Sequence, residues 1–164
     1  QQEMAAGALQ KMNMRQYTDL IQKLLDSKQL LDEFKGELIE AMMDQKLDEE
    51  FKIVKDGMEI EFVPSLITPA SQDPVLKETD SILEGWLSCD NPSMLSFCRQ
   101  LLEQEVLEMR PMDFEGIAPQ KRAASRGRLV YQAMKDEDGW NQFAKDHQLE
   151  DTEAYPLLIE KRGD

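Results

Sequence analysis

Histidine and cysteine are scarce in this chain of 164 residues, which has one histidine, His147, and two cysteines, Cys89 and Cys98. The two cysteines have neither the number of a disulfide framework nor the C-x-x-C spacing of a zinc or redox pair. The chain also lacks G-x-S-x-G, H-E-x-x-H and a glycine-rich phosphate loop. We therefore predict no metal, no cofactor and no catalytic residue, and we expect a protein that is not an enzyme.

Long hydrophobic runs are absent as well. No apolar stretch approaches the ~20 residues that a membrane-spanning helix needs. The first ten residues lack the charged and apolar regions of a signal peptide. A first residue that is Gln rather than Met suggests a fragment or a processed chain. We expect no membrane partner and a cytoplasmic localisation, with the nucleus as the alternative.

Basic residues are outnumbered, because 19 Lys and Arg stand against 33 Asp and Glu, giving a formal net charge of -14. This charge opposes direct binding to nucleic acid, whose backbone is also negative. A solvated acidic surface is the simplest interpretation. The sharper alternative is an acidic mimic of nucleic acid that occupies a basic protein.

The strongest periodic signal runs from Tyr17 to Leu47, where Tyr17, Leu24, Leu31 and Leu38 recur every seven residues. This spacing predicts one long amphipathic helix with a buried face.

A helical hairpin is the alternative for the same stretch. Asp26 and Gln29 form a capping-box pattern inside it, which is typical of a helix start. The seven-residue register nevertheless continues through Ser27, and no Gly or Pro marks a turn. The pattern therefore favours a continuous helix.

Further apolar residues widen this face beyond what a two-stranded coiled coil needs. Such a face belongs to a bundle core, or serves in part as a dimer or partner interface. The residues that we predict for a partner surface are Leu20, Leu24, Leu31, Phe34, Leu38 and Met42.

A β-hairpin is predicted from Phe51 to Val63. Its centre, Asp56-Gly57, is the dipeptide that suits a two-residue type I′ turn. The predicted pairs are Lys55 with Met58, Val54 with Glu59, Ile53 with Ile60, Lys52 with Glu61, and Phe51 with Phe62. One face carries Phe51, Ile53, Met58, Ile60 and Phe62. The other face sets Lys52 opposite Glu61, a favourable cross-strand pair.

The three prolines Pro64, Pro69 and Pro74 mark the next segment as a linker or extended arm. We predict a long helix plus hairpin in 1–63, a linker in 64–74 and a bundle of shorter helices in 75–164, with one compact domain as the alternative. The predicted fold class is mainly α.

Four or five shorter helices make up the predicted C-terminal bundle. Asp73-Pro74 and Asn91-Pro92 are helix-start signals, for helices that end near Leu87 and Met109. The second helix should bury Met94, Phe97, Cys98, Leu101, Leu102 and Val106. A third helix covers 119–135, and a fourth carries Trp140, Phe143, Ala144 and His147, with His147 as a packing residue. A final apolar piece runs from Tyr155 to Ile159.

A basic cluster stands out in the acidic chain: Lys121, Arg122, Arg126 and Arg128 fall within eight residues. Pairing with nearby carboxylates inside the protein is the simpler interpretation. The alternative is contact with an anion or an acidic peptide at a helix start, for which arginine forks are suited.

These patterns predict a non-catalytic protein–protein interaction module, such as an adaptor, a chaperone-like protein or a regulatory protein. Its partner would be another protein, or a second copy bound through the long helix. The alternatives are the acidic nucleic-acid mimic and a carboxylate-based hydrolase, because 33 acids leave room for a catalytic pair.

Overall fold

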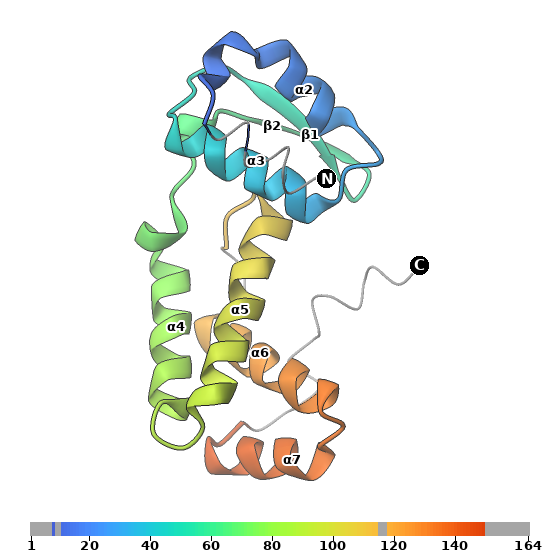
Figure 1. Cartoon of the computed structure of the whole chain (residues 1–164). Helices are drawn as coiled ribbons and strands as arrows, with labels where there is room; N and C mark the ends of the chain where they lie inside the picture. The colour runs from blue at the N-terminus through green and yellow to red at the C-terminus, as the bar shows by residue number, and fades with distance from the viewer. Residues whose placement is uncertain (1–7, 9–10, 115–117, 150–164) are drawn as a thin grey trace. The chain divides into compact units, whose positions relative to one another are not determined.

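A computed structural model of the chain describes residues 8, 11–114 and 118–149 (Figure 1). These residues are mainly helical and include one two-stranded sheet, which confirms the predicted fold class. The chain divides into two compact units, unit 1 from Gln1–Ala70 and Gln104–Asp113, and unit 2 from Ser71–Glu103 and Phe114–Asp164. The predicted apolar piece at Tyr155 to Ile159 lies outside the described residues.

Along the chain, the described elements are helices that precede and follow one β-hairpin. The first group is η1 (Met14–Gln16), α2 (Thr18–Asp26), α3 (Asp32–Asp44), β1 (Phe51–Lys55), β2 (Met58–Phe62) and η2 (Pro64–Leu66). The second group is η3 (Ala70–Gln72), α4 (Pro74–Leu87), α5 (Pro92–Met109), α6 (Pro119–Ala133) and α7 (Glu137–Asp146).

The continuous helix predicted between Tyr17 and Leu47 is wrong, because the chain breaks between α2 and α3. Ser27 and Leu31 both have extended backbones, with ψ angles of 124° and 149°. The Ser27 hydroxyl accepts a hydrogen bond from the Gln29 amide at 3.3 Å. Such a local side-chain bond competes with the helical ladder. The first helix ends here although neither Gly nor Pro is present.

The helix start predicted at Asp26 is also displaced. Asp26 is the last residue of α2, and its carboxylate accepts a bond from the Gln22 side chain at 2.9 Å. The second helix begins at Asp32 instead. Asp32 and Glu33 place negative charge in its first turn, where the helix dipole favours it.

The hairpin forms as predicted, with all five expected pairs in antiparallel register. Asp56 and Gly57 have φ angles of 50° and 78°, which is the positive-φ backbone of a type I′ turn. Lys52 and Glu61 are 3.6 Å apart across the strands.

The inner face of the hairpin joins the core of unit 1, with one exception. Phe51, Ile53 and Phe62 are buried, and the Phe51 and Phe62 rings lie 6.1 Å apart. Met58, predicted on the same face, is 62% exposed because it flanks the turn at the end of the hairpin. The buried residues of this core are Met14, Ile21, Leu25, Leu38, Ile39, Ala41, Met42, Met43, Leu47, Phe51, Ile53 and Phe62.

The end of α5 completes unit 1 and brings buried charge with it. Arg110 is almost fully buried, and its Nε donates to a Glu40 carboxylate oxygen at 2.6 Å. The Lys55 ammonium donates to the Glu108 carbonyl at 2.6 Å. Because an unpaired buried charge is costly, these contacts fix the position of the segment 104–113 within the unit.

In unit 2 the predicted helix starts are confirmed. Asp73 accepts bonds from the amides of Val75 at 2.9 Å and Leu76 at 3.3 Å at the start of α4. Asn91 accepts from the Met94 amide at 3.1 Å at the start of α5. Both helices have their predicted bounds.

Aromatic rings form much of the core of unit 2. The Trp86 and Phe143 rings meet edge to face at 5.6 Å, and the His147 ring lies 4.4 Å from Phe143. The histidine is therefore part of the packing, as predicted. Phe97 was predicted inward but is 55% exposed. The buried residues of this core are Leu83, Leu87, Met94, Leu95, Cys98, Ala123, Ala124, Val130, Trp140, Phe143, Ala144 and Leu149.

Gly36 in α3 allows the close approach of Leu107, since a Cβ at position 36 would overlap the Leu107 carbonyl. We expect Gly36→Ala to lower the free energy of unfolding by at least about 2 kcal/mol, within the range of core overpacking. Urea unfolding followed by circular dichroism measures the change.

Gly85→Ala in α4 is the matched control, because a Cβ there meets nothing within 4 Å. It should stabilise the protein by about 0.5–1 kcal/mol through helix propensity. Equal effects of the two substitutions would contradict the close packing of Gly36 against Leu107.

Candidate protein-interaction surface

The six residues predicted for a partner surface are separated by the fold. Leu38 and Met42 were predicted to contact a partner, but both lie in the core of unit 1. The break after α2 separates α3 from the first helix and gives α3 its own inward face. Leu24 and Phe34 are half-buried. Leu38 and Met42 therefore offer almost no surface to a partner, and Leu24 and Phe34 offer only part of their side chains.

Leu20 and Leu31 remain at the surface, with 47% and 60% of each residue exposed. The first lies in α2, and the second immediately precedes α3. Ile21 and Leu25 fill the inward face of α2. Leu20 therefore lies outside the core, although it belongs to the same amphipathic helix.

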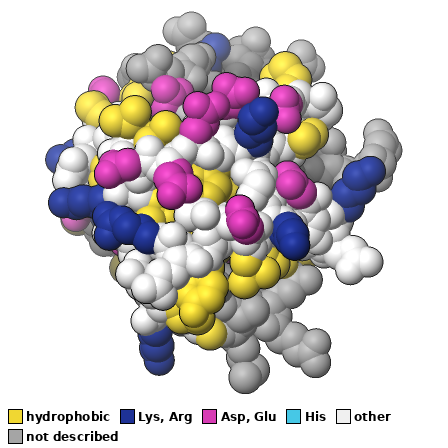
Figure 2. Space-filling model, turned by 90° about the horizontal axis from the view of Figure 1, so that it is seen from above, with side chains coloured by type: hydrophobic (Ala, Val, Ile, Leu, Met, Phe, Trp, Pro, Cys, Tyr) yellow, Lys and Arg dark blue, Asp and Glu magenta, His cyan; other side chains and the backbone are white. Residues whose placement is uncertain are grey.

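The outer face of the hairpin adds mixed character to this part of unit 1. It carries Lys52, Val54, Glu59 and Glu61, all of which are exposed. Acidic and hydrophobic side chains lie side by side on one face of the molecule (Figure 2). Surfaces that mix apolar and charged side chains occur at protein interfaces, whose rims are polar.

Gln22 joins α2 to the outer edge of β1. Its Nε2 donates to the Lys52 carbonyl at 2.9 Å, and the Lys52 amide donates back to Gln22 Oε1 at 3.0 Å. The side-chain amide thereby takes the place of a neighbouring strand at this residue. Sequence reasoning missed this contact, because it joins positions thirty residues apart.

An acid pair lies where the chain enters β1. A hydrogen bond to Glu61, together with the charge of that side chain, raises the pKa of Glu50, and Lys52 opposes the shift. Both carboxyl groups are at the surface, because Glu50 and Glu61 are exposed. The surface beside β2 is therefore locally negative, because Lys52 offsets only one of the two carboxylates of Glu50 and Glu61.

The predicted anion contact in α6 is also divided by the fold. Lys121 is exposed and Arg128 is half-buried, but Arg122 and Arg126 are fully buried in unit 2. Arg122 donates to the Phe114 carbonyl at 3.3 Å, and its guanidinium lies 5.2 Å from the centre of the Phe114 ring. These contacts give Arg122 a structural role within unit 2.

One signal for this burial was present in the sequence. Small residues, Ala123, Ala124 and Gly127, surround Arg122 and Arg126 in α6, and all three are buried. Small side chains allow a helix to lie close to its neighbours. The arginines in the same turns are then enclosed as well.

A pocket of about 410 Å³ lies at α6 and α7 in unit 2. Burial raises the pKa of the Tyr131 hydroxyl, and the Asp136 carboxylate adds to the shift. The lining residues are Arg128, Tyr131, Gln132, Lys135, Asp136, Glu137, Trp140 and Asn141. Two bases and two acids among them balance, so the lining favours neither an anion nor a cation.

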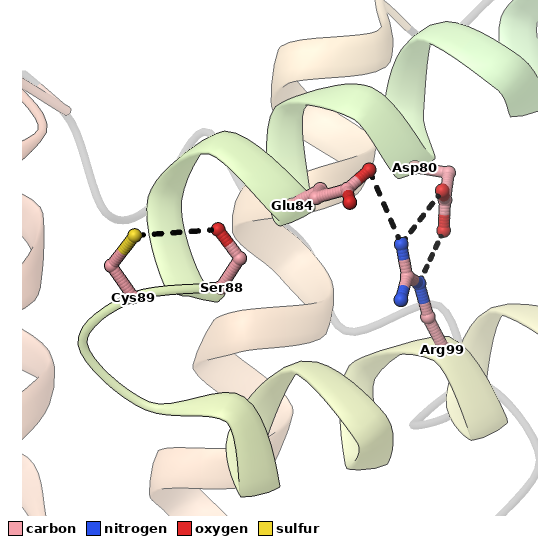
Figure 3. A network of polar contacts seen from close by, with 5 residues as sticks. All are labelled: Asp80, Glu84, Ser88, Cys89 and Arg99. Carbon is pink, nitrogen blue, oxygen red and sulfur yellow. Dashed lines mark hydrogen bonds and ion pairs between the residues drawn. The ribbon is translucent and has the colours of Figure 1, made fainter.

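Arg99 ties α5 to α4 through a bidentate contact with Asp80, at 2.8 Å and 3.1 Å, and through Glu84 at 3.5 Å (Figure 3). The hydrogen bonds to Asp80 raise the pKa of Arg99. This geometry indicates a structural ion pair. In the same view the Ser88 hydroxyl lies 3.9 Å from the Cys89 sulfur at the end of α4.

The two cysteines have opposite environments. Cys89 is exposed and Cys98 is buried in the core of unit 2. Burial raises the pKa of the Cys98 thiol to about 12, although the positive charge of Arg126 acts in the other direction. Because thiolate is the reactive form, burial disfavours reaction of Cys98 as a nucleophile near neutral pH.

Within the described ranges, no cluster of three or more His, Cys, Asp or Glu side chains is arranged to hold a metal ion. None of the helices in these ranges has the length and apolar character needed to cross a membrane.

No protein-family model, curated protein or solved structure matches this chain.

The environments of the two cysteines predict a difference in thiol labelling. At pH 8 a maleimide should modify Cys89 rapidly, whereas the thiolate fraction of Cys98 is about a thousandfold below that of an ordinary thiol. Mass spectrometry of the folded protein should therefore show one modification, and two after unfolding in urea. Cys89→Ser is the control and should remove the rapid modification. Rapid labelling of folded Cys89→Ser would contradict the burial of Cys98.

The acid pair predicts a specific titration. Glu61→Gln should lower the pKa of Glu50, because an amide can donate to the Glu50 carboxylate and carries no charge. Carbon-detected NMR of the glutamate carboxyl groups measures the shift. Glu59→Gln is the control, since Glu59 is not among the groups that shift Glu50. An unchanged Glu50 titration in Glu61→Gln would show that the pair does not form in solution.

Proposed function

We propose that this protein is a non-catalytic protein–protein interaction module, acting as an adaptor, a chaperone-like protein or a regulatory protein. It binds its partner through the surface of unit 1 around α2. The observation that supports this proposal is the exposure of Leu20 and Leu31, 47% and 60%, next to a core that is otherwise well filled.

The two exposed leucines would be apolar anchors in such a contact. Burying one leucine side chain stabilises a complex by about 1.5–3 kcal/mol, and a few buried anchors carry most of the energy of an interface. The charged residues of the hairpin, such as Lys52 and Glu59, lie at the surface of the same unit. Charges in such positions contribute to partner choice and association rate more than to affinity.

The net charge of -14 favours a second candidate, an acidic mimic that occupies a nucleic-acid-binding protein. The two candidates differ in salt response. A complex held by charge loses affinity steeply between ~0.1 and ~0.5 M salt, whereas an apolar contact does not. For the hydrolase alternative, the acid pair Glu50 and Glu61 gives little support, because both side chains lie at the open surface.

The double variant Leu20→Ser, Leu31→Ser tests the apolar surface. Exposed substitutions change stability by about 0.5 kcal/mol or less, so the variant should stay folded. We expect at least a tenfold weaker affinity for a protein captured from the native host and then purified, measured by isothermal titration calorimetry. Self-association, if present, should weaken equally in sedimentation equilibrium.

Phe97→Ser is the matched control, because Phe97 is 55% exposed but belongs to unit 2. It should bind like the unchanged protein. A chain that sediments as a monomer and captures no protein would contradict the proposed function. Unchanged affinity of the double variant would exclude this surface.

A further inference from the structure

The register of the hairpin determines which backbone groups point away from it. Lys55 and Met58 flank a two-residue turn, so they form a hydrogen-bonded pair. Pairs alternate along antiparallel strands. The amide and carbonyl groups of Glu59 and Glu61 therefore point away from β1, toward the outer edge of β2.

The equivalent edge of β1 shows that this assignment is correct. Lys52 pairs with Glu61 across the hairpin, and its amide and carbonyl both bond outward to the Gln22 side chain. Helix α2 thus covers β1. Among the described residues, no backbone–backbone bond outside the regular elements involves Glu59 or Glu61. No described segment therefore pairs with the outer edge of β2, which we call the open edge.

Along the open edge, the two faces of the hairpin differ in chemistry. On the outer face, Glu59 and Glu61 are exposed, and Glu50 lies against Glu61. On the inner face, Met58 is 62% exposed and Ile60 is half-buried. An added strand would therefore meet carboxylates on one face and uncovered apolar surface on the other.

We infer that β2 binds an extended segment of a partner protein as a third strand, with Lys or Arg opposite Glu59 and Glu61 and an apolar residue between them. Side chains of directly opposed residues share a face, so the two bases meet the carboxylates and the intervening residue covers Ile60. The backbone bonds supply affinity and the alternating side chains supply selectivity. The inference rests on the proposed function and names the class of partner.

A second copy of the chain fits this edge less well. Two β2 strands paired edge to edge would bring Glu59 and Glu61 of both copies together, and like charges placed opposite one another are unfavourable. Charge complementarity therefore favours a basic strand from another protein.

The test uses the full chain and a fluorescein-labelled, end-capped heptapeptide of alternating lysine and valine. Fluorescence anisotropy at low salt should show saturable binding. An alternating glutamate–valine peptide should bind at least tenfold more weakly. Equal binding of the two peptides, or none of either, would overturn the inference.

Backbone methylation of the peptide separates strand pairing from simple charge attraction. If the peptide pairs antiparallel to β2 with lysines opposite Glu59 and Glu61, the lysine amides point toward β2 and the valine amides point away. Methylating the lysine amides should weaken binding at least tenfold, while methylating the valine amides should leave it nearly unchanged. Equal effects of the two methylations would overturn the pairing, whatever the chain variants do.

Charge reversal tests the same edge on the protein. Glu59→Lys with Glu61→Lys should reverse the preference, so that the glutamate–valine peptide binds more tightly. Glu78→Lys with Glu103→Lys is the charge-matched control, because both residues are exposed acids of unit 2. The control should keep the original preference. A reversed preference in the control, or an unchanged one at Glu59 and Glu61, would overturn the inference.

The leucine variant distinguishes this inference from the function on which it rests. Leu20→Ser with Leu31→Ser should still bind the lysine–valine peptide, because neither leucine belongs to β2. If the peptide fails while partner binding depends on those leucines, only the strand inference falls. If the peptide binds while partner affinity ignores the leucines, only the α2 surface falls.

Discussion

The antiparallel register of β1 and β2 decides which side chains of unit 1 reach its core. Asp56 and Gly57 close the hairpin with positive φ angles, and the pairing then follows residue by residue. A shift of one residue would turn Phe51 and Ile53 to the solvent. It would also turn the Lys52 backbone away from Gln22, so the contact between α2 and the sheet depends on the same register.

Buried basic residues recur in both units of an acidic protein. The buried charged residues include five bases and two acids, Lys35, Lys55, Arg110, Arg122 and Arg126 against Asp73 and Glu105. Their burial removes positive charge from the surface more than negative charge. The surface that a partner meets is therefore more acidic than the composition alone indicates, which favours basic partner segments.

Local chemistry explains what could be predicted from the sequence. The hairpin and the start of α4 depend on neighbouring residues, Asp56-Gly57 and Asp73-Pro74, and both were predicted correctly. The break at Ser27 is local too. A serine is only a weak signal for the end of a helix, and the apolar seven-residue repeat that runs through it favoured a continuous helix.

The candidate surfaces depended on contacts between distant positions, which periodicity cannot show. Leu31 and Leu38 are seven residues apart and equivalent in the seven-residue pattern, yet only Leu31 is exposed, because it precedes α3 whereas Leu38 lies on the buried side of that helix. Arg122 is buried beside Phe114, a residue from the loop before its helix. Gln22 covers β1 although thirty residues separate it from Lys52.

Unit 1 is built from two stretches of chain that are far apart in sequence, because Gln104–Asp113 completes a unit that begins with Gln1–Ala70. During synthesis on the ribosome, α3 and the hairpin emerge before Arg110 is available to pair with Glu40. At translation rates of roughly 5–20 residues per second, the unit waits a few seconds for its last segment. During this interval the nascent chain exposes the side of α3 at Gly36 that Leu107 later covers.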